Sequence, residues 1–127
     1  MPAKILIVDD EGDMLLLMQR ILSEREDYEV TMAKDPFEVR QLLLTNDFDL
    51  VITDLQMPGF DGFQVLDAVK QRSVDTTVII MTAGGSVKLL AEAIRRGADA
   101  CIIKPFRKET VLQMVEQALT SSLHKAG

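Results

Sequence analysis

The sequence contains 127 residues, of which 47% are hydrophobic and 27% are charged, a balance that suits one globular domain with a substantial core. The net charge of −6 argues against direct binding of this domain to nucleic acid or to an anionic membrane. No apolar run approaches the ~20 residues that span a bilayer, and Lys4 leads directly into an apolar run, so we expect neither a membrane segment nor a signal peptide. The single cysteine, Cys101, cannot form an intramolecular disulfide, which agrees with a cytoplasmic location.

Apolar runs and helical patterns alternate from the start of the chain. Residues 4–8 predict a strand, and residues 11–26 predict a helix with one apolar face. Residues 28–32 predict a second strand. Asp35 is expected to cap the next helix, because a proline follows it directly and Glu38 stands three residues after it.

The same alternation continues to the end of the chain. Further strands are expected over residues 50–53, 78–81 and 100–103. Asp61 is expected to begin the third helix, and the fourth should start at Ser86 and stop at Gly97. The last helix is indicated by apolar residues at helical spacing, namely Val111, Leu112, Val115, Ala118 and Leu119.

Five strands that alternate with five helices predict an α/β fold, (βα)5, with a doubly wound, five-stranded parallel sheet and right-handed crossovers. Four of the strand runs lack polar alternation, which is typical of strands buried on both faces of such a sheet. We expect a single domain over residues 1–127, with its core over about 4–120 and a polar tail over 120–127.

Four of the predicted strands end on polar residues that phosphoryl chemistry can use. Asp9 and Asp10 follow the first strand and Asp54 follows the third. Thr82 follows the fourth strand and Lys104 the fifth. Because the carboxyl ends of parallel strands meet at one edge of a sheet, we expect these side chains to converge there.

Three carboxylates at one place need a positive partner. Two carboxylates about 4 Å apart repel by roughly 1 kcal/mol in water and by about 4 kcal/mol at an effective dielectric constant near 20. Oxygen ligands with room for water suit Mg²⁺, which commonly binds one or two carboxylates together with a phosphate. Lys104 would supply a further positive charge for a phosphate oxygen. The residues therefore predict a site that accepts a phosphoryl group.

Each of these residues also has a simpler interpretation. Asp9 and Asp10 could be a helix cap and a first-turn acid. Asp54 could be a turn initiator ahead of Pro58-Gly59, which resemble the central pair of a type II turn. Thr82 could simply cap a loop, and Lys104 could simply point into solvent. These interpretations explain the residues singly but not their order at successive strand ends.

The ordered set of motifs strongly resembles the receiver domain of two-component response regulators. The matching segments are Asp9-Asp10, Asp54, the run from Met57 to Gly62, Thr82-Ala83 and Lys104-Pro105-Phe106. The resemblance covers the chain from about residue 4 to residue 120, and it implies a flavodoxin-like sheet with strand order 2-1-3-4-5. It also implies a phosphorylation-activated switch in a phosphorelay, which is not an enzyme acting on outside substrates.

The resemblance implies roles for the acidic residues. Asp54 would be the phosphoacceptor, taking the group from a sensor histidine kinase or a histidine phosphotransfer protein. Asp10 and Asp54 would bind Mg²⁺ directly, and Asp9 would act through a water molecule. Gln56 would add its backbone carbonyl as a further ligand.

The resemblance also implies how the phosphoryl group would be held and sensed. Lys104 would bind a phosphoryl oxygen, aided by a cis bond to Pro105. Thr82 would swing toward the phosphoryl group and draw Ala83 and the following loop with it. In the family this change is read on the face formed by the fourth helix, the fifth strand and the fifth helix. That face could bind a second copy of the chain or an output partner.

Two positions depart from the usual pattern of the family. Cys101 stands where receivers usually carry a tyrosine or phenylalanine that turns inward on activation, and we expect it to be a small apolar filler. Gly84 stands at a position whose side chain often tunes hydrolysis of the phosphoryl group, and glycine cannot make that contact.

Two alternatives from other functional classes remain open. A phosphohydrolase of the haloacid dehalogenase type also combines Asp, Thr or Ser, Lys and Mg²⁺ on a parallel sheet. Such an enzyme needs a second aspartate two residues after the nucleophile, where this chain has Gln56. A degenerate receiver that serves only as an interaction module should have lost an acid, the threonine or the lysine, and all of them are present.

Overall fold

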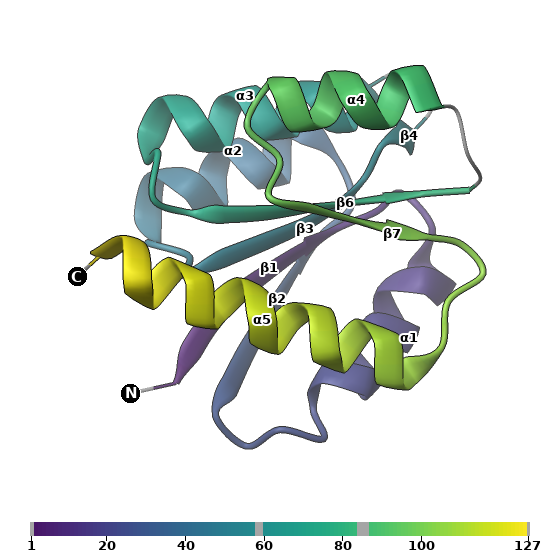
Figure 1. The fold of residues 1–127 in the computed structure, drawn as a ribbon, viewed down its shortest axis with the longest axis vertical. Helices are drawn as coiled ribbons and strands as arrows, with labels where there is room; N and C mark the ends of the chain where they lie inside the picture. Colours follow the sequence, from purple (N-terminus) through teal and green to yellow (C-terminus); the bar gives the residue numbers. More distant parts are fainter. Residues whose placement is uncertain (1, 58–59, 84–86, 127) are drawn as a thin grey trace.

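The computed structural model describes residues 2–57, 60–83 and 87–126, without the side chains of residue 60 and residues 121–126. Strands and helices alternate through most of this chain (Figure 1). In chain order they are β1 (Ala3–Val8), α1 (Gly12–Leu22), β2 (Tyr28–Ala33), α2 (Pro36–Thr45), β3 (Leu50–Asp54), β4 (Gln56–Met57), β5 (Phe60–Asp61), α3 (Gly62–Arg72), β6 (Thr77–Thr82), α4 (Val87–Arg95), β7 (Ala100–Ile103) and α5 (Lys108–Ala126).

The main sheet has five parallel strands in the order β2-β1-β3-β6-β7. This is the predicted order 2-1-3-4-5, because the two extra strands, β4 and β5, pair with each other in a separate antiparallel hairpin. The α/β class, the parallel sheet and the flavodoxin-like topology are therefore confirmed. The hairpin was not predicted, since two-residue strands are too short to give a periodic signal.

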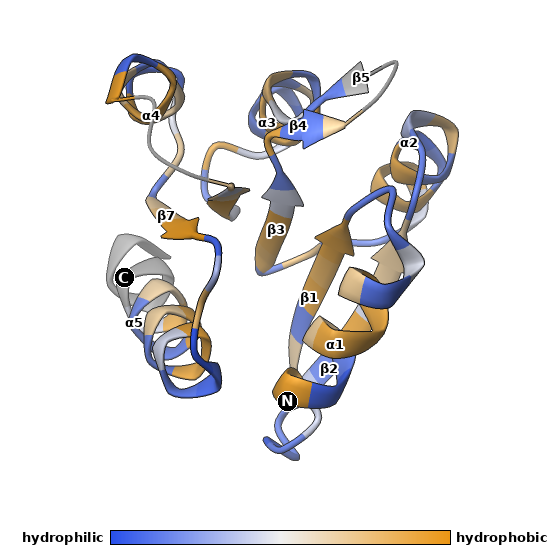
Figure 2. Ribbon diagram, turned by 90° about the vertical axis from the view of Figure 1, so that its right-hand side faces the viewer, coloured by the Kyte–Doolittle hydropathy of each residue, from blue (hydrophilic) through white to orange (hydrophobic). Residues whose placement is uncertain are grey.

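Helices cover both faces of the sheet and create two hydrophobic cores. One face carries α2, α3 and α4, and the other carries α1 and α5 (Figures 1 and 2). Along β1 the side chains alternate between the two cores, with Leu6 and Val8 in the first and Ile5 and Ile7 in the second. All four are fully buried, as expected for a strand with an uninterrupted apolar sequence.

Local sequence signals explain the starts of two helices, α2 and α3. The side chain of Asp35 accepts a hydrogen bond from the Glu38 backbone N–H at 2.8 Å, and Asp61 accepts one from the Gln64 N–H at 3.0 Å. Both predicted caps are thus confirmed. The Gln64 side chain returns a hydrogen bond to the Asp61 N–H at 3.2 Å, which completes a capping box. These caps fix the starts of α2 and α3.

Some element ends differ from the prediction. Helix α1 ends at Leu22 and not near residue 26, because the polar residues after Ser23 fold into turns. The predicted start of the fourth helix, Ser86, lies outside the described residues, and the predicted stop at Gly97 is confirmed by its φ of 110°. Helix α5 continues to Ala126 through the predicted polar tail. Among the described residues, no helix is long and apolar enough to cross a bilayer.

Candidate functional site

The polar residues at the strand ends meet at one edge of the sheet, as predicted. The neighbouring strands β1, β3, β6 and β7 finish together there, with Val8 beside Thr53 and Thr82 beside Ile103. The ladder continues past β7, since the Lys104 backbone N–H donates to the Thr82 carbonyl at 2.7 Å. Residues far apart in the sequence are thereby held side by side by backbone hydrogen bonds.

The three aspartates form a compact acidic cluster. Asp9, Asp10 and Asp54 each offer one carboxylate oxygen, and these oxygens all lie within 4.8 Å of one another. Asp9 is fully buried and Asp54 is 5% exposed, whereas Asp10 is open to solvent. The cluster therefore has a buried side and an open side, and a ligand can reach it through the open side.

Lys104 neutralises part of this charge. Its ammonium Nζ lies 2.7 Å from Asp54 Oδ2 and 3.8 Å from Asp9 Oδ2. Burial acts to lower the pKa of Lys104, but the hydrogen bond and charge of Asp54, with the charge of Asp9, outweigh it and raise the pKa above its usual value. Lys104 is therefore positively charged at any physiological pH.

Asp9 has an oxygen that no described residue satisfies. Its Oδ1 accepts a hydrogen bond from the Glu11 backbone N–H at 2.9 Å, while its buried Oδ2 has no hydrogen-bond partner among the described residues. Burial raises the pKa of Asp9 to about 6, and the nearby charge of Asp54 adds to this effect against the opposing Glu11 N–H. A buried carboxylate oxygen that accepts no hydrogen bond from the described residues, and that lies beside two other carboxylates, fits a hard divalent cation such as Mg²⁺.

The backbone around Asp54 is closely packed. Asp54 Oδ1 accepts a hydrogen bond from the Gln56 N–H at 3.1 Å, so the backbone of Gln56 lies directly against the acid. Gly62 approaches from the start of α3, and a Cβ there would stand 2.5 Å from the Asp54 carbonyl oxygen and 2.8 Å from the Leu55 Cα. Gly62 belongs to a motif shared with the family, but its contact with Asp54 was not predicted, because it depends on how α3 packs against β3.

The remaining residues of the predicted site lie on β6, on β7 and just after them. Thr82 is 3% exposed at the end of β6, and Ala83 is exposed beside it. The bond from Lys104 to Pro105 is cis, as expected. Cys101 is half-buried on β7 and packs against the core under α4, where burial raises the pKa of its thiol. Gly84 lies outside the described residues.

Comparison with known proteins agrees with this geometry. Residues 5–116 match the family described as the response regulator receiver domain, and this chain belongs to that family. A receiver domain from Methanospirillum hungatei JF-1, described as CheY-like, superposes with a TM-score of 0.91 at 28% identity and with complete coverage of both chains. Family membership makes the chain a signalling domain of two-component systems and not a classical enzyme, which sets aside the phosphohydrolase alternative.

Longer regulators contain a similar domain. The transcriptional regulatory protein ResD of Bacillus subtilis is 34% identical over 116 residues, which cover 91% of this chain and 48% of ResD. SrrA of Staphylococcus aureus is also 34% identical, over 94% of this chain and 48% of its own length. NtrX from Brucella abortus superposes with a TM-score of 0.92 at 34% identity, with 99% of this chain and 29% of NtrX covered. The chain spans about half the length of the curated relatives that it matches.

Proposed function

We propose that Asp54 accepts a phosphoryl group from a histidine kinase or a histidine phosphotransfer protein, in a Mg²⁺-dependent reaction that switches the domain. The observation that carries the proposal is the arrangement around Asp54, with a lysine at 2.7 Å on one oxygen and two further aspartates within 4.8 Å. An acid that is 5% exposed but lies beside an open carboxylate can be reached by a donor while most bulk water is kept away.

Each residue of the site would have a separate role in the transfer. An oxygen of Asp54 forms the new O–P bond while the P–N bond of the donor phosphohistidine breaks and its imidazole leaves. The Lys104 ammonium, which already contacts Asp54, would move to an oxygen of the incoming group and offset its charge. Bound to Asp10 and Asp54, and to Asp9 through water, Mg²⁺ would supply charge neutralisation and in-line orientation. The backbone carbonyl of Gln56 is the third proposed direct ligand from the protein.

The donor would contact α1. This helix begins directly after the acidic pair, and it has two exposed leucines, Leu16 and Leu17. A cavity of about 420 Å³ lies between α1 and the loop that follows Lys104-Pro105, and Leu17, Ile21 and Phe106 form its apolar lining. We propose this surface for the histidine-bearing domain of the kinase, because α1 begins just after Asp10 and Phe106 follows Lys104 by two residues, so a partner bound there would extend toward the acceptor.

The signal would leave through the face formed by α4, β7 and α5, by contact with an output partner or a second copy of the chain. Ile103 on β7 is half exposed there. Two charged residues of α5 are engaged elsewhere, since Lys108 pairs with Glu24 at 3.1 Å and Glu116 with Arg25 at 3.7 Å. The centre of the proposed output face therefore lies nearer to α4 and β7 than to these residues of α5.

Incubation with acetyl phosphate tests the proposal. Intact mass should show one phosphoryl adduct in the presence of Mg²⁺, and EDTA should abolish it. Asp54→Asn should carry no adduct, while Asp47→Asn, a matched change at an exposed acid at the other end of the sheet, should react like the wild type. An adduct that is insensitive to EDTA, or that persists in full on Asp54→Asn, would refute the proposal.

A further inference from the structure

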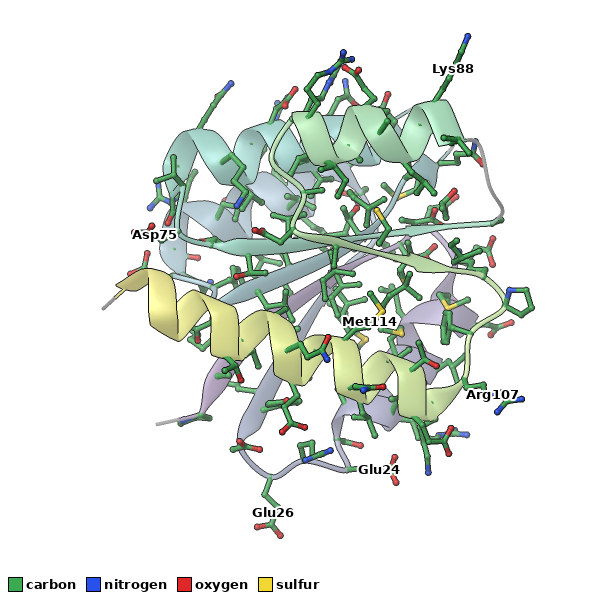
Figure 3. The ribbon with its side chains drawn as sticks, viewed as in Figure 1. Glu24, Glu26, Asp75, Lys88, Arg107 and Met114 are labelled. Carbon is green, nitrogen blue, oxygen red and sulfur yellow. The ribbon has the colours of Figure 1, made fainter. Side chains whose placement is uncertain are left out.

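Helix α4 is attached to the domain less firmly than its neighbour α3. Its one fully buried residue among those described is Ala93, whereas α3 buries Gly62, Val65, Leu66 and Val69. At the amino-terminal end, Val87 is 79% exposed, and Lys88 points away from the body of the domain (Figure 3). Burial of apolar surface therefore holds α4 only weakly in place.

The carboxyl-terminal end of α4 is fixed by a specific set of side-chain contacts. The guanidinium of Arg96 lies 4.6 Å from the centroid of the Phe63 ring, and its Nη1 lies 3.5 Å from Asp67 Oδ2. Phe63 and Asp67 stand one turn apart on α3, so one side chain contacts two positions of the neighbouring helix. The Arg96 Nε also donates to Glu92 Oε1 at 2.9 Å, which holds the guanidinium in this orientation.

The backbone after α4 strengthens this attachment. The Ala98 N–H donates to the Ala93 carbonyl at 2.9 Å and the Gly97 N–H to the Ile94 carbonyl at 3.0 Å, the pair of bonds that defines a Schellman motif. One residue further on, the Asp99 N–H donates to the Val78 carbonyl at 2.8 Å and so joins the chain to β6. The end of α4 is therefore tied to both α3 and the sheet.

The amino-terminal half of α4 borders a cavity through Leu89. A cavity of about 550 Å³ adjoins it, lined by Leu55, Gln56, Met57, Asp61, Phe63 and Leu89. This cavity extends from the residues directly after Asp54 to the first turn of α4. The end of the helix nearest the site thus has room to move, and the distant end does not.

From this asymmetry we infer that α4 is a lever anchored by Arg96 on Phe63 and Asp67, and that its amino-terminal end is the one that moves. The movement in response to phosphorylation rests on the proposed function, but the anchor does not. Arg95 is the matched comparison, because it is the adjacent arginine, is largely exposed, and pairs with Glu92 of its own helix without reaching α3.

The anchor can be tested without any phosphoryl donor. In amide hydrogen exchange of the whole chain, Arg96→Ala should speed exchange at residues 91–98 by roughly three- to tenfold, the loss expected for one cation–π contact and one partly exposed ion pair. Arg95→Ala should change these amides by less than about twofold. Phe63→Leu, which removes only the cation–π contact, should reproduce part of the effect of Arg96→Ala, and the double variant should add little to Arg96→Ala. Equal effects of the two arginine variants, or no effect of Arg96→Ala, would show that Arg96 does not anchor α4 to α3.

The lever is tested by adding beryllofluoride with Mg²⁺ and recording amide shifts. In the wild type the shifts should be largest at residues 88–91 and smallest at 96–98, and Arg96→Ala should reduce this difference. Shifts of equal size at both ends of α4 in the wild type would contradict the inference that only its amino-terminal end moves. If no adduct forms in the wild type, the proposed function fails, while the exchange experiment still decides the anchor.

Discussion

Lys104 Nζ lies 2.7 Å from Asp54 Oδ2 and 3.8 Å from Asp9 Oδ2, so one ammonium faces two of the three clustered carboxylates. Lys104 and Asp54 are 50 residues apart in sequence, and the alignment of β3, β6 and β7 brings them together. The resting site therefore already contains one positive charge, which in the proposed reaction would contact an oxygen of the incoming phosphoryl group.

Replacing Lys104 by methionine tests this relationship. The change removes the charge but keeps an unbranched side chain, so the three carboxylates lose their internal counterion. We expect the free energy of unfolding in EDTA to fall by about 1–3 kcal/mol. Millimolar Mg²⁺ should then stabilise the variant more than the wild type, because no ammonium competes for the oxygens. Urea unfolding with and without Mg²⁺ measures both effects.

Lys108→Met is the control for that experiment, since Lys108 forms an exposed ion pair with Glu24. Such pairs contribute little, so this variant should lie within about 0.5 kcal/mol of the wild type. If Lys104→Met is tolerated as well as Lys108→Met and shows an unchanged Mg²⁺ response, Lys104 does not share a site with the carboxylates.

Asp9 should make stability depend on pH in the absence of metal. Its pKa is raised from 3.8 to about 6 in the folded state, so folding favours the protonated acid. This contribution is fully present below about pH 4 and is lost as pH rises through 6, a total of about 3 kcal/mol. Asp9→Asn lacks this loss. In EDTA, the free energy of unfolding of Asp9→Asn relative to that of the wild type should therefore rise by about 1–2 kcal/mol between pH 5 and pH 7.5.

Magnesium should reverse the pH effect, because a nearby cation favours the ionised form of Asp9, and a water molecule on the ion could donate to the buried Oδ2 that now lacks a hydrogen bond. Urea unfolding at the two pH values, with EDTA and with Mg²⁺, gives the four free energies required for each protein. A difference between Asp9→Asn and the wild type that is the same at both pH values would show that Asp9 does not titrate in this range.

Gly62 should be intolerant of any side chain. A Cβ there would stand 2.5 Å from the Asp54 carbonyl oxygen, so Gly62→Ala must displace α3 or β3. We expect a loss of about 1–3 kcal/mol, typical of overpacking, together with slower phosphorylation as Asp54 shifts. Gly12→Ala is the control, because a Cβ at the start of α1 meets nothing within 4 Å. Thermal unfolding that ranks the two variants equally would contradict this contact.

Much of the site could be predicted from the sequence, because its acidic, hydroxyl and lysine residues directly follow strands. Uninterrupted apolar runs identify such strands reliably. Asp9, Asp10, Asp54, Thr82 and Lys104 could be placed at one edge in this way. Contacts between elements were not predictable, since the Lys104–Asp54 pair and the approach of Gly62 depend on strand alignment and helix seating. The early end of α1 was missed because the residues after Ser23 include two glutamates and an arginine, which also favour helices.

The route of the signal can be tested at Thr82 and Cys101. Thr82 lies at the end of β6, and its carbonyl accepts the Lys104 N–H, whereas Cys101 sits under α4 among apolar side chains. Thr82→Ala should bind beryllofluoride with Mg²⁺ yet show weakened amide shifts in α4. Cys101→Ala should respond like the wild type, because a thiol is too small to alternate between outward and buried positions. NMR spectra with the opposite ranking would assign the transmission to Cys101.

The most direct test of the account is to locate the phosphoryl group chemically. After reaction with acetyl phosphate and Mg²⁺, borohydride reduction converts a phosphorylated aspartate into homoserine, and peptide mass spectrometry locates it. We predict homoserine at residue 54 alone, and none when EDTA replaces Mg²⁺. Homoserine at residue 9 or residue 10, or at residue 54 without any need for Mg²⁺, would contradict the account.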